Sequence, residues 1–289
     1  MLVGPRAFGV LEQDSRIDKK IIYDKTIPWK EKAALWTILR AERYDLVIDL
    51  RQTMFGLFLG ARYRSSIFTR TPKSVIHMKD RHLWKLNFLG LRIDGNQPLI
   101  EFGLAEQQNV ERLFSKWQID KECLLIAISP GARNMTKRWG KEGFARVCRL
   151  IREEYKKAKI IMVGDQQDSV IAEEIIKTVD LSIINACGQT TLSGLACLLS
   201  RCRLLIANDS APMHLAWAVG TPVAAIFGPT DYRKYAPCGS YDRVIRKALD
   251  CSPCRKSLCP QQTRECMQLI TAEEVFAVSK EILNNGKRI

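Results

Sequence analysis

Residues 203–231 read RLLIANDSAPMHLAWAVGTPVAAIFGPTD, and this stretch decides the fold class. The apolar runs 204–207 and 223–227 each have the length and composition of a buried strand. Between them, 211–219 has the character of a short helix, and Gly220 marks its end. Two strands joined by a helix form a parallel pair, so the sequence predicts an α/β fold.

The start of this predicted helix is a candidate anion site. Asp209 or Ser210 is the N-cap candidate, and the N–H groups that follow from Ala211 have no partner inside the helix. Because the helix begins at the carboxyl end of a strand, these donors and the positive end of the helix dipole would face a crevice. Gly228 and Thr230, in a turn after the next strand, could face the same crevice.

The stretch from Asn208 to Asp231 resembles the donor-binding core of glycosyltransferase family 9, the lipopolysaccharide heptosyltransferases. The family pattern reads Asp-Ser/Thr-Gly-x-x-His, then Ala-x-Gly-x-Pro, then Phe-Gly-Pro-Thr. This chain matches it, except that Ala211 stands where glycine is usual. The alternative interpretation of the same stretch is an ordinary strand–helix–strand unit with a structural histidine.

The resemblance implies an α/β fold of the GT-B type, in which two Rossmann-like domains face a crevice. It implies transfer of heptose from ADP-heptose to the inner core of lipopolysaccharide, an anionic acceptor, with inversion of the anomeric centre. No cofactor is required for such a transfer. Another class of enzyme with the same fold, a nucleotide-sugar epimerase, would need paired catalytic carboxylates and a histidine. We cannot identify these residues in the sequence.

Composition and charge are those of a soluble globular protein with an anionic partner. The 289 residues are 46% hydrophobic and 26% charged, with a net charge of +14. We find no transmembrane run and no signal pattern. No nucleic-acid-binding motif is present and the basic residues are spread along the chain, so we expect no nucleic acid partner. We expect a cytoplasmic protein in peripheral contact with the cytoplasmic face of the inner membrane.

We place a domain boundary near residue 118. An acceptor-side α/β domain (1–118) would precede a nucleotide-sugar-binding domain (119–289) that ends in a Cys-rich segment and a helix. Compared with the family, the first domain looks shortened, because the opening residues show no strand, glycine loop and helix. The family's loop at that place carries an Asp proposed as general base. The alternative function is therefore a nucleotide-sugar-binding homologue that lacks the base and cannot turn over.

The resemblance assigns the two catalytic residues, Lys137 and Asp209. A predicted strand ends at Ser129, Gly131 turns the chain, and a basic loop leads to Lys137. We expect Ser129 and Gly131 to help bind the donor. A cation there would stabilise the charge that develops as the nucleotide diphosphate leaves. Asp209 would orient the sugar or cap the helix, and His214 would hydrogen-bond to the donor phosphate or to Asp209.

Two further loops are candidates for the donor pocket. Asp168 lies near a predicted helix start after the strand 160–163, where the resemblance implies an acid near the donor ribose or base. Its alternative role is that of a partner for the helix dipole. Gly188 opens the turn 188–193, which lines the nucleotide pocket in the family but could also be only a helix-capping turn.

Three arginines are candidates for binding the anionic acceptor. Arg51 follows the predicted strand 46–50 on the crevice side, and Arg62 and Arg64 lie in a region rich in aromatic and basic residues. Guanidinium groups suit phosphate and carboxylate ligands. The alternative is that these arginines lie on an ordinary solvated face.

Four cysteines form a compact pattern near the C-terminus. Their spacing, C-x2-C-x4-C-x6-C, suits a tetrahedral structural zinc site without a catalytic role. An iron–sulfur cluster, two disulfides or free thiols remain alternatives. The four residues are Cys251, Cys254, Cys259 and Cys266.

Overall fold

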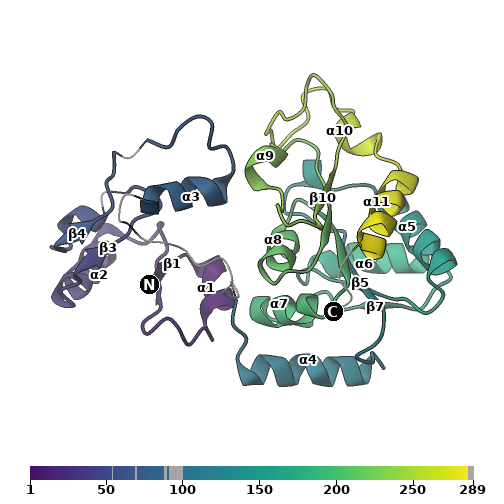
Figure 1. Ribbon diagram of the computed structural model, residues 1–289, viewed down its shortest axis with the longest axis horizontal. Helices are drawn as coiled ribbons and strands as arrows, with labels where there is room; N and C mark the ends of the chain where they lie inside the picture. The colour runs from purple at the N-terminus through teal and green to yellow at the C-terminus, as the bar shows by residue number, and fades with distance from the viewer. Residues whose placement is uncertain (54, 69, 88–89, 91–99, 286–289) are drawn as a thin grey trace. The chain divides into compact units, whose positions relative to one another are not determined.

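The computed structural model describes the chain except for residues 54, 69, 88–89, 91–99 and 286–289 (Figure 1). Its elements fall into two compact units. We call the first the large unit; it comprises Met1, Arg6–Lys20 and Pro98–Ile289. The second, the small unit, comprises Leu2–Pro5 and Ile21–Gln97.

The large unit contains a six-stranded parallel sheet whose strand order is β10-β9-β8-β5-β6-β7. Counted along the chain from β5, this is the Rossmann order 3-2-1-4-5-6 read from the other edge. The strand order reverses between β5 and β8, which are hydrogen-bonded neighbours. The strands are β5 (Leu125–Ser129), β6 (Lys159–Met162), β7 (Ile183–Asn185), β8 (Leu204–Asn208), β9 (Val223–Ile226) and β10 (Arg243–Ile245).

Helices cover both faces of this sheet (Figure 1). One face packs against α5 (Lys141–Glu154), α6 (Asp168–Lys177) and α11 (Ala272–Asn285). The other packs against α4 (Leu104–Lys116), α7 (Leu192–Ser200) and α8 (Ala211–Ala218). Strands covered on both faces are nearly continuous in apolar residues, which is why 204–207 and 223–227 form hydrophobic runs in the sequence.

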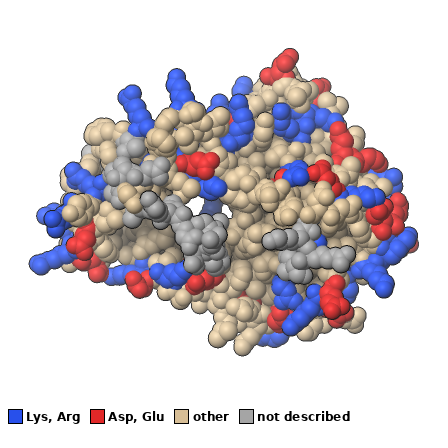
Figure 2. Space-filling model, viewed as in Figure 1, with Lys and Arg blue, Asp and Glu red and all other residues tan. Residues whose placement is uncertain are grey.

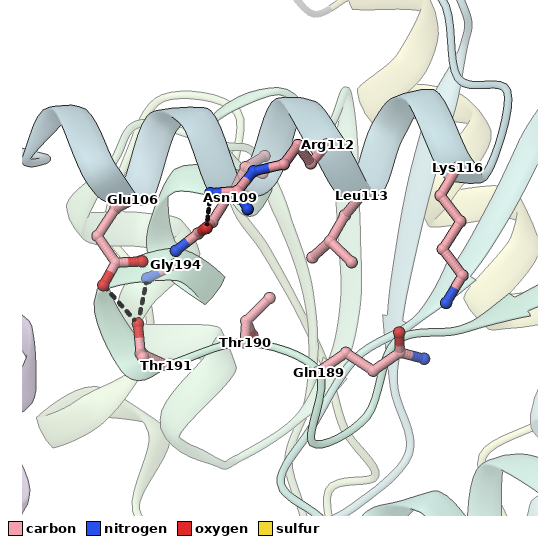
Figure 3. A pocket seen from close by; sticks show the side chains of 10 residues that line it. Glu106, Asn109, Arg112, Leu113, Lys116, Gln189, Thr190, Thr191 and Gly194 are labelled. Atoms are coloured by element: carbon pink, nitrogen blue, oxygen red, sulfur yellow. Dashed lines mark hydrogen bonds between the residues drawn. The ribbon is translucent and has the colours of Figure 1, made fainter.

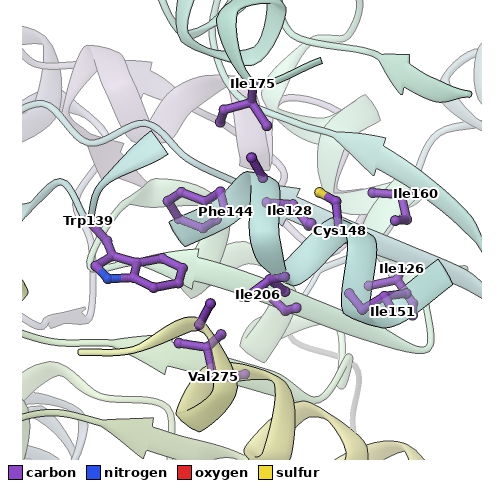
Figure 4. Close-up of a cluster of buried hydrophobic side chains, with 14 of the residues drawn as sticks. Ile126, Ile128, Trp139, Phe144, Cys148, Ile151, Ile160, Ile175, Ile206 and Val275 are labelled. Atoms are coloured by element: carbon purple, nitrogen blue, oxygen red, sulfur yellow. The ribbon is translucent and has the colours of Figure 1, made fainter. Parts of the chain in front are cut away.

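The core on the α5 side is closed by an aromatic pair (Figure 4). The rings of Trp139 and Phe144 meet edge to face, with their centroids 4.9 Å apart. The indole Nε1 of Trp139 donates a hydrogen bond to the carbonyl of Ile270, 3.0 Å away. A buried Trp with its N–H satisfied fixes the end of the loop that leads from β5 to α5.

Short elements complete the large unit. They are α1 (Pro5–Leu11), η2 (Met135–Lys137), α9 (Tyr232–Tyr235) and α10 (Glu265–Gln268).

The small unit contains two separate pairs of short parallel strands. Leu2–Val3 (β1) pairs with Ile21–Ile22 (β2), and Leu46–Val47 (β3) pairs with Tyr63–Arg64 (β4). The remaining elements are α2 (Trp29–Ala41), η1 (Phe55–Phe58) and α3 (Met78–Asn87).

The amino end corrects one expectation from the sequence. A strand, a glycine and a helix do follow one another there, as β1, Gly4 and α1. They escaped detection because β1 has two residues, which is too short for a periodic pattern, and α1 contains no buried residue. The expectation that all three are absent is therefore wrong.

The division into two units also differs from the predicted boundary near residue 118. Helix α4 belongs to the large unit, and its Val110 and Phe114 are buried in the cluster beneath α7. The predicted boundary lies just after this helix. The apolar face of α4 packs against α7, which lies about 80 residues later in the chain. Tertiary packing therefore decides to which unit α4 belongs.

Candidate functional site

The candidate site lies at the carboxyl ends of β5 and β8. These strands flank the point where the strand order reverses, which is where open α/β sheets bind ligands. A cavity of about 330 Å³ lies among the segments that follow strands β5, β8 and β9. It is lined by Asn134, Lys137, Asp209, His214, Pro229, Thr230, Tyr235, Arg255 and Lys256.

Lys137 and Asp209 form an ion pair in this cavity. The Lys137 Nζ donates to Oδ2 of Asp209 over 2.7 Å. Asp209 is only 8% exposed, whereas the side chain of Lys137 is partly accessible. A nearly buried carboxylate needs a cationic partner, so Asp209 fixes the position of the ammonium group in the lining of the cavity. The structure thus brings together the two residues predicted to be catalytic.

Asn208 positions the loop that carries Lys137. Its side chain is fully buried, donates from Nδ2 to the Pro130 carbonyl (2.8 Å) and accepts at Oδ1 from the Trp139 backbone N–H (3.1 Å). Both ends of the 130–139 loop are therefore fastened to the last residue of β8. Sequence reasoning missed this role, although an amide directly before Asp209 at a strand end was the available signal.

The N-terminus of α8 opens beside the ion pair. Ser210 is the N-cap residue, but its hydroxyl donates to the Asn208 carbonyl (3.2 Å) and makes no cap bond to the helix. Ala211 is exposed at the first helical position. His214 lines the cavity one turn further on. The first turn of the helix thus keeps N–H donors that its own N-cap side chain does not satisfy.

Asp168 is wedged between two neighbouring loops. Its carboxyl group lies against the backbones of Gly131 and Gly164, where an added Cβ would come within 1.8 Å and 2.5 Å of its oxygens. Burial raises the pKa of Asp168, and the Asp165 N–H donates to Oδ2 over 3.1 Å. Gly131 is therefore required by the approach of Asp168. Asp168 lies outside the cavity that contains Lys137.

The remaining predicted loop residues have structural surroundings. Ser129 is fully buried, and its Oγ has no hydrogen-bond partner among the described residues. Gly188 adopts φ +73° with Gln166 directly beside it, so the turn requires glycine. Gly228 lies against Met267 and Cys266 and does not line the cavity, whereas Thr230 does.

A second cavity, of about 310 Å³, lies between α4 and the segment 189–194 (Figure 3). Several polar groups that line this cavity are hydrogen-bonded to one another. Thr191 caps α7 by accepting from the Gly194 N–H (2.9 Å), and its hydroxyl donates to Glu106 (3.0 Å). The 188–193 turn therefore does cap a helix, and the first cavity is the stronger candidate for chemistry.

The three arginines predicted to bind the acceptor belong to the small unit. Arg62 stacks on the ring of Tyr63, with its guanidinium carbon 5.2 Å from the ring centroid. Arg64 donates to the Leu57 carbonyl (3.0 Å), and Arg51 is exposed.

The cysteine pattern is not organised as a metal centre in the described part of the chain. No group of three or more His, Cys, Asp or Glu side chains there could hold a metal ion, so the zinc hypothesis is not supported. All four cysteines are free thiols. Cys266 packs against the core and Gly228 instead, and burial raises the pKa of its thiol, with a further rise from the other three.

A Rossmann-order sheet with a lysine–carboxylate pair and a helix N-terminus at its switch point is an arrangement typical of nucleotide-binding α/β proteins. Comparison of the sequence with protein families gives the particular family. The chain belongs to glycosyltransferase family 9 (heptosyltransferase), whose sequence model matches residues 79–264. The protein is thus a glycosyltransferase, as the resemblance implied.

Relatives of similar length carry heptosyltransferase names. Lipooligosaccharide heptosyltransferase 2 of Campylobacter jejuni serotype O:2 is 26% identical over 264 residues, 86% of this chain and 82% of that protein. Lipopolysaccharide heptosyltransferase 3 of Escherichia coli K12 is 25% identical over 285 residues, 88% of this chain and 78% of that protein.

Solved structures confirm the predicted α/β, GT-B fold class. The family 9 glycosyltransferase from Veillonella parvula superposes with a TM-score of 0.83 at 22% identity, covering 99% of this chain and 88% of that one. Heptosyltransferase II of E. coli gives a TM-score of 0.74 at 20% identity, covering 98% and 88%. Among the described residues, no helix is both long and apolar enough to cross a membrane.

Proposed function

We propose that this chain transfers heptose from ADP-heptose to the anionic inner core of lipopolysaccharide, inverting the anomeric centre. The observation that carries the proposal is the Lys137–Asp209 pair in a cavity at the sheet's switch point. Family membership and the names of the relatives supply the reaction and the substrate class. Structures of an E. coli heptosyltransferase with ADP and with a fluorinated ADP-heptose share the fold.

The chemistry needs a cradle for the departing diphosphate. In a single displacement, negative charge builds on the leaving phosphate, and fixed donors aimed at it lower the barrier. Lys137 supplies a cation that Asp209 holds in place, and the backbone N–H of Ala211 supplies a dipole. Thr230 and His214 line the same cavity and can hydrogen-bond to phosphate or sugar oxygens.

The reaction also needs a general base to take the proton of the acceptor hydroxyl, and the surroundings of two candidate acids favour a second function. Asp14 is bound by Arg16, whose hydrogen bonds hold the pKa of that carboxyl below its usual range. Asp49 accepts from the N–H groups of Arg51 and Thr53. Both acids have structural tasks, and this favours the alternative of a nucleotide-sugar-binding homologue that lacks a base.

The charge distribution suits an anionic acceptor at a membrane surface. The net charge is +14, and Figure 2 shows Lys and Arg distributed over the visible face among fewer acids. We propose that Arg51, Arg62 and Arg64 meet phosphate or carboxylate groups of the acceptor. Peripheral contact with the cytoplasmic face of the inner membrane would follow from the same charges.

The test is a transfer assay with ADP-heptose and a Kdo–lipid A type acceptor, with ADP binding measured in parallel by calorimetry. We expect ADP binding and formation of the heptosylated acceptor. ADP binding without turnover would favour the binding homologue. Neither binding nor turnover would contradict both candidate functions.

A further inference from the structure

The segment between Cys254 and Cys259 forms one wall of the cavity. The backbone N–H of Arg255 donates to the Pro229 carbonyl over 2.7 Å. On the other side, the Thr136 hydroxyl donates to the Lys256 carbonyl over 3.3 Å. These bonds fasten the segment both to the turn after β9 and to the loop that carries Lys137.

The side chains on this segment are the cavity's uncommitted cations. Arg255 and Lys256 both line the cavity and are exposed. Within the described chain, neither side chain makes a hydrogen bond or ion pair. Arg255 adopts φ +58°, a backbone conformation that favours glycine. A strained arginine whose side chain has no internal task is a feature of ligand-binding sites.

The charges of the side chains that line the cavity favour an anionic ligand. Lys137 and Asp209 neutralise each other, so the excess positive charge of the lining comes from Arg255 and Lys256. A diphosphate carries several negative charges that one paired lysine and a helix terminus do not balance. Arginine binds phosphate oxygens through two parallel N–H donors, and lysine adds a point charge.

We infer that Arg255 and Lys256, contributed by the Cys-rich segment, bind the diphosphate of the nucleotide-sugar donor. This inference rests on the proposed function and extends it to a segment that the sequence reading treated as structural. In the transfer, the bond between the anomeric carbon and the diphosphate oxygen breaks as the acceptor hydroxyl oxygen bonds to that carbon, and the hydroxyl proton passes to solvent. The electron pair stays on the diphosphate, opposite these two cations.

The test measures equilibrium binding of three probes to the full chain: ADP, inorganic pyrophosphate and adenosine. The variants are Arg255→Ala, Lys256→Ala and their double. The matched control is Lys156→Ala/Lys157→Ala, which removes two adjacent exposed cations before β6, at the amino ends of the strands. We expect the double variant to weaken ADP and pyrophosphate binding about tenfold or more, because charged hydrogen bonds are lost. Adenosine binding and the control variant should be unchanged.

Four outcomes separate this inference from the function on which it rests. ADP and pyrophosphate binding within twofold of wild type in the double variant overturns the inference alone. An equal loss for adenosine also overturns it, since the cavity would then be deformed. Pyrophosphate binding that depends on the pair, without ADP binding, supports the subsite and contradicts ADP-heptose as donor. No binding of either anion by the wild type overturns both.

Steady-state transfer distinguishes the donor diphosphate from phosphates on the acceptor. A raised KM for ADP-heptose with an unchanged KM for the acceptor supports the inference. A raised KM for the acceptor alone would assign Arg255 and Lys256 to the acceptor and overturn it.

Discussion

At the scale of single residues, the central feature is a lysine held by a carboxylate 72 positions further along the chain. Asp209 is nearly buried, so its charge is weakly screened and it fixes the Lys137 ammonium group. A cation held in advance stabilises a developing charge without reorganisation. Position therefore matters as much as charge at this site.

Lys137→Ala should lower kcat by about two orders of magnitude, as removal of a preorganised transition-state contact does. The measurement is steady-state transfer from ADP-heptose, with thermal unfolding recorded because the variant leaves Asp209 unpaired. Lys137→Arg is the control that keeps the charge and should retain more activity. A variant folded like wild type with an unchanged kcat would remove Lys137 from the mechanism.

At the scale of elements, the loops at the carboxyl ends of the strands are interlocked. Asn208 on β8 ties both ends of the loop after β5, and Asp168 at the start of α6 fills the space left by Gly131. The loop after β5 is thus shaped by its two neighbours in the sheet. A substitution in one loop should therefore displace a side chain in a neighbouring loop.

The resemblance implies that Asp168 lies near the donor ribose or base. Gly131→Ala should therefore weaken ADP binding about tenfold by pushing away the Asp168 carboxyl, which the Cβ would approach to 1.8 Å. Calorimetry measures the affinity. Gly140→Ala is the matched control, since its Cβ would meet nothing closer than Glu142 at 3.4 Å. In an Asp168→Ala background, Gly131→Ala should add little. Additive losses would show that Gly131 acts independently of Asp168.

At the scale of the whole molecule, the segment 6–20 is part of the large unit although it opens the chain. Arg16 binds Asp14 and approaches Glu101 (3.4 Å), while the Ser15 hydroxyl donates to Glu101 (3.0 Å). Asp14 is buried, and the hydrogen bonds from Arg16 lower its pKa. This cluster couples the amino-terminal segment to global stability.

Asp14→Asn should lower the free energy of unfolding at pH 7, because the charged partner of Arg16 is lost. The pKa of Asp14 is lower in the folded than in the unfolded chain, so its stabilisation is present above about pH 4 and lost as the pH falls further. The difference between the two proteins should therefore shrink from pH 5 to pH 3 in urea unfolding. A difference that is constant over this range would contradict the linkage.

The sequence predicted strands β5, β6, β8 and β9 of the large sheet because each is a local hydrophobic signal, but it did not predict β10, which has only three residues. Strands buried on both faces are apolar along most of their length, and the pattern from Asn208 to Thr230 is continuous in the chain. The family resemblance assigned Lys137, Asp209, His214 and Thr230 to the donor site, and all four line one cavity in the structure. Two-residue strands such as β1 carry no periodicity, so the amino end was misread.

By itself, then, the sequence determined the fold class, the family and the loops that carry the candidate site, since these depend on hydrophobic periodicity and contiguous motifs. Only the tertiary structure shows that Asp209 forms an ion pair with Lys137 and that Asn208 is hydrogen-bonded to the loop 130–139. It also decides that α4 belongs to the large unit and that Arg255 and Lys256 line the cavity. The physical reason is the distance along the chain. Each of these contacts joins segments remote in sequence, which only the packing of the sheet and its helices brings together.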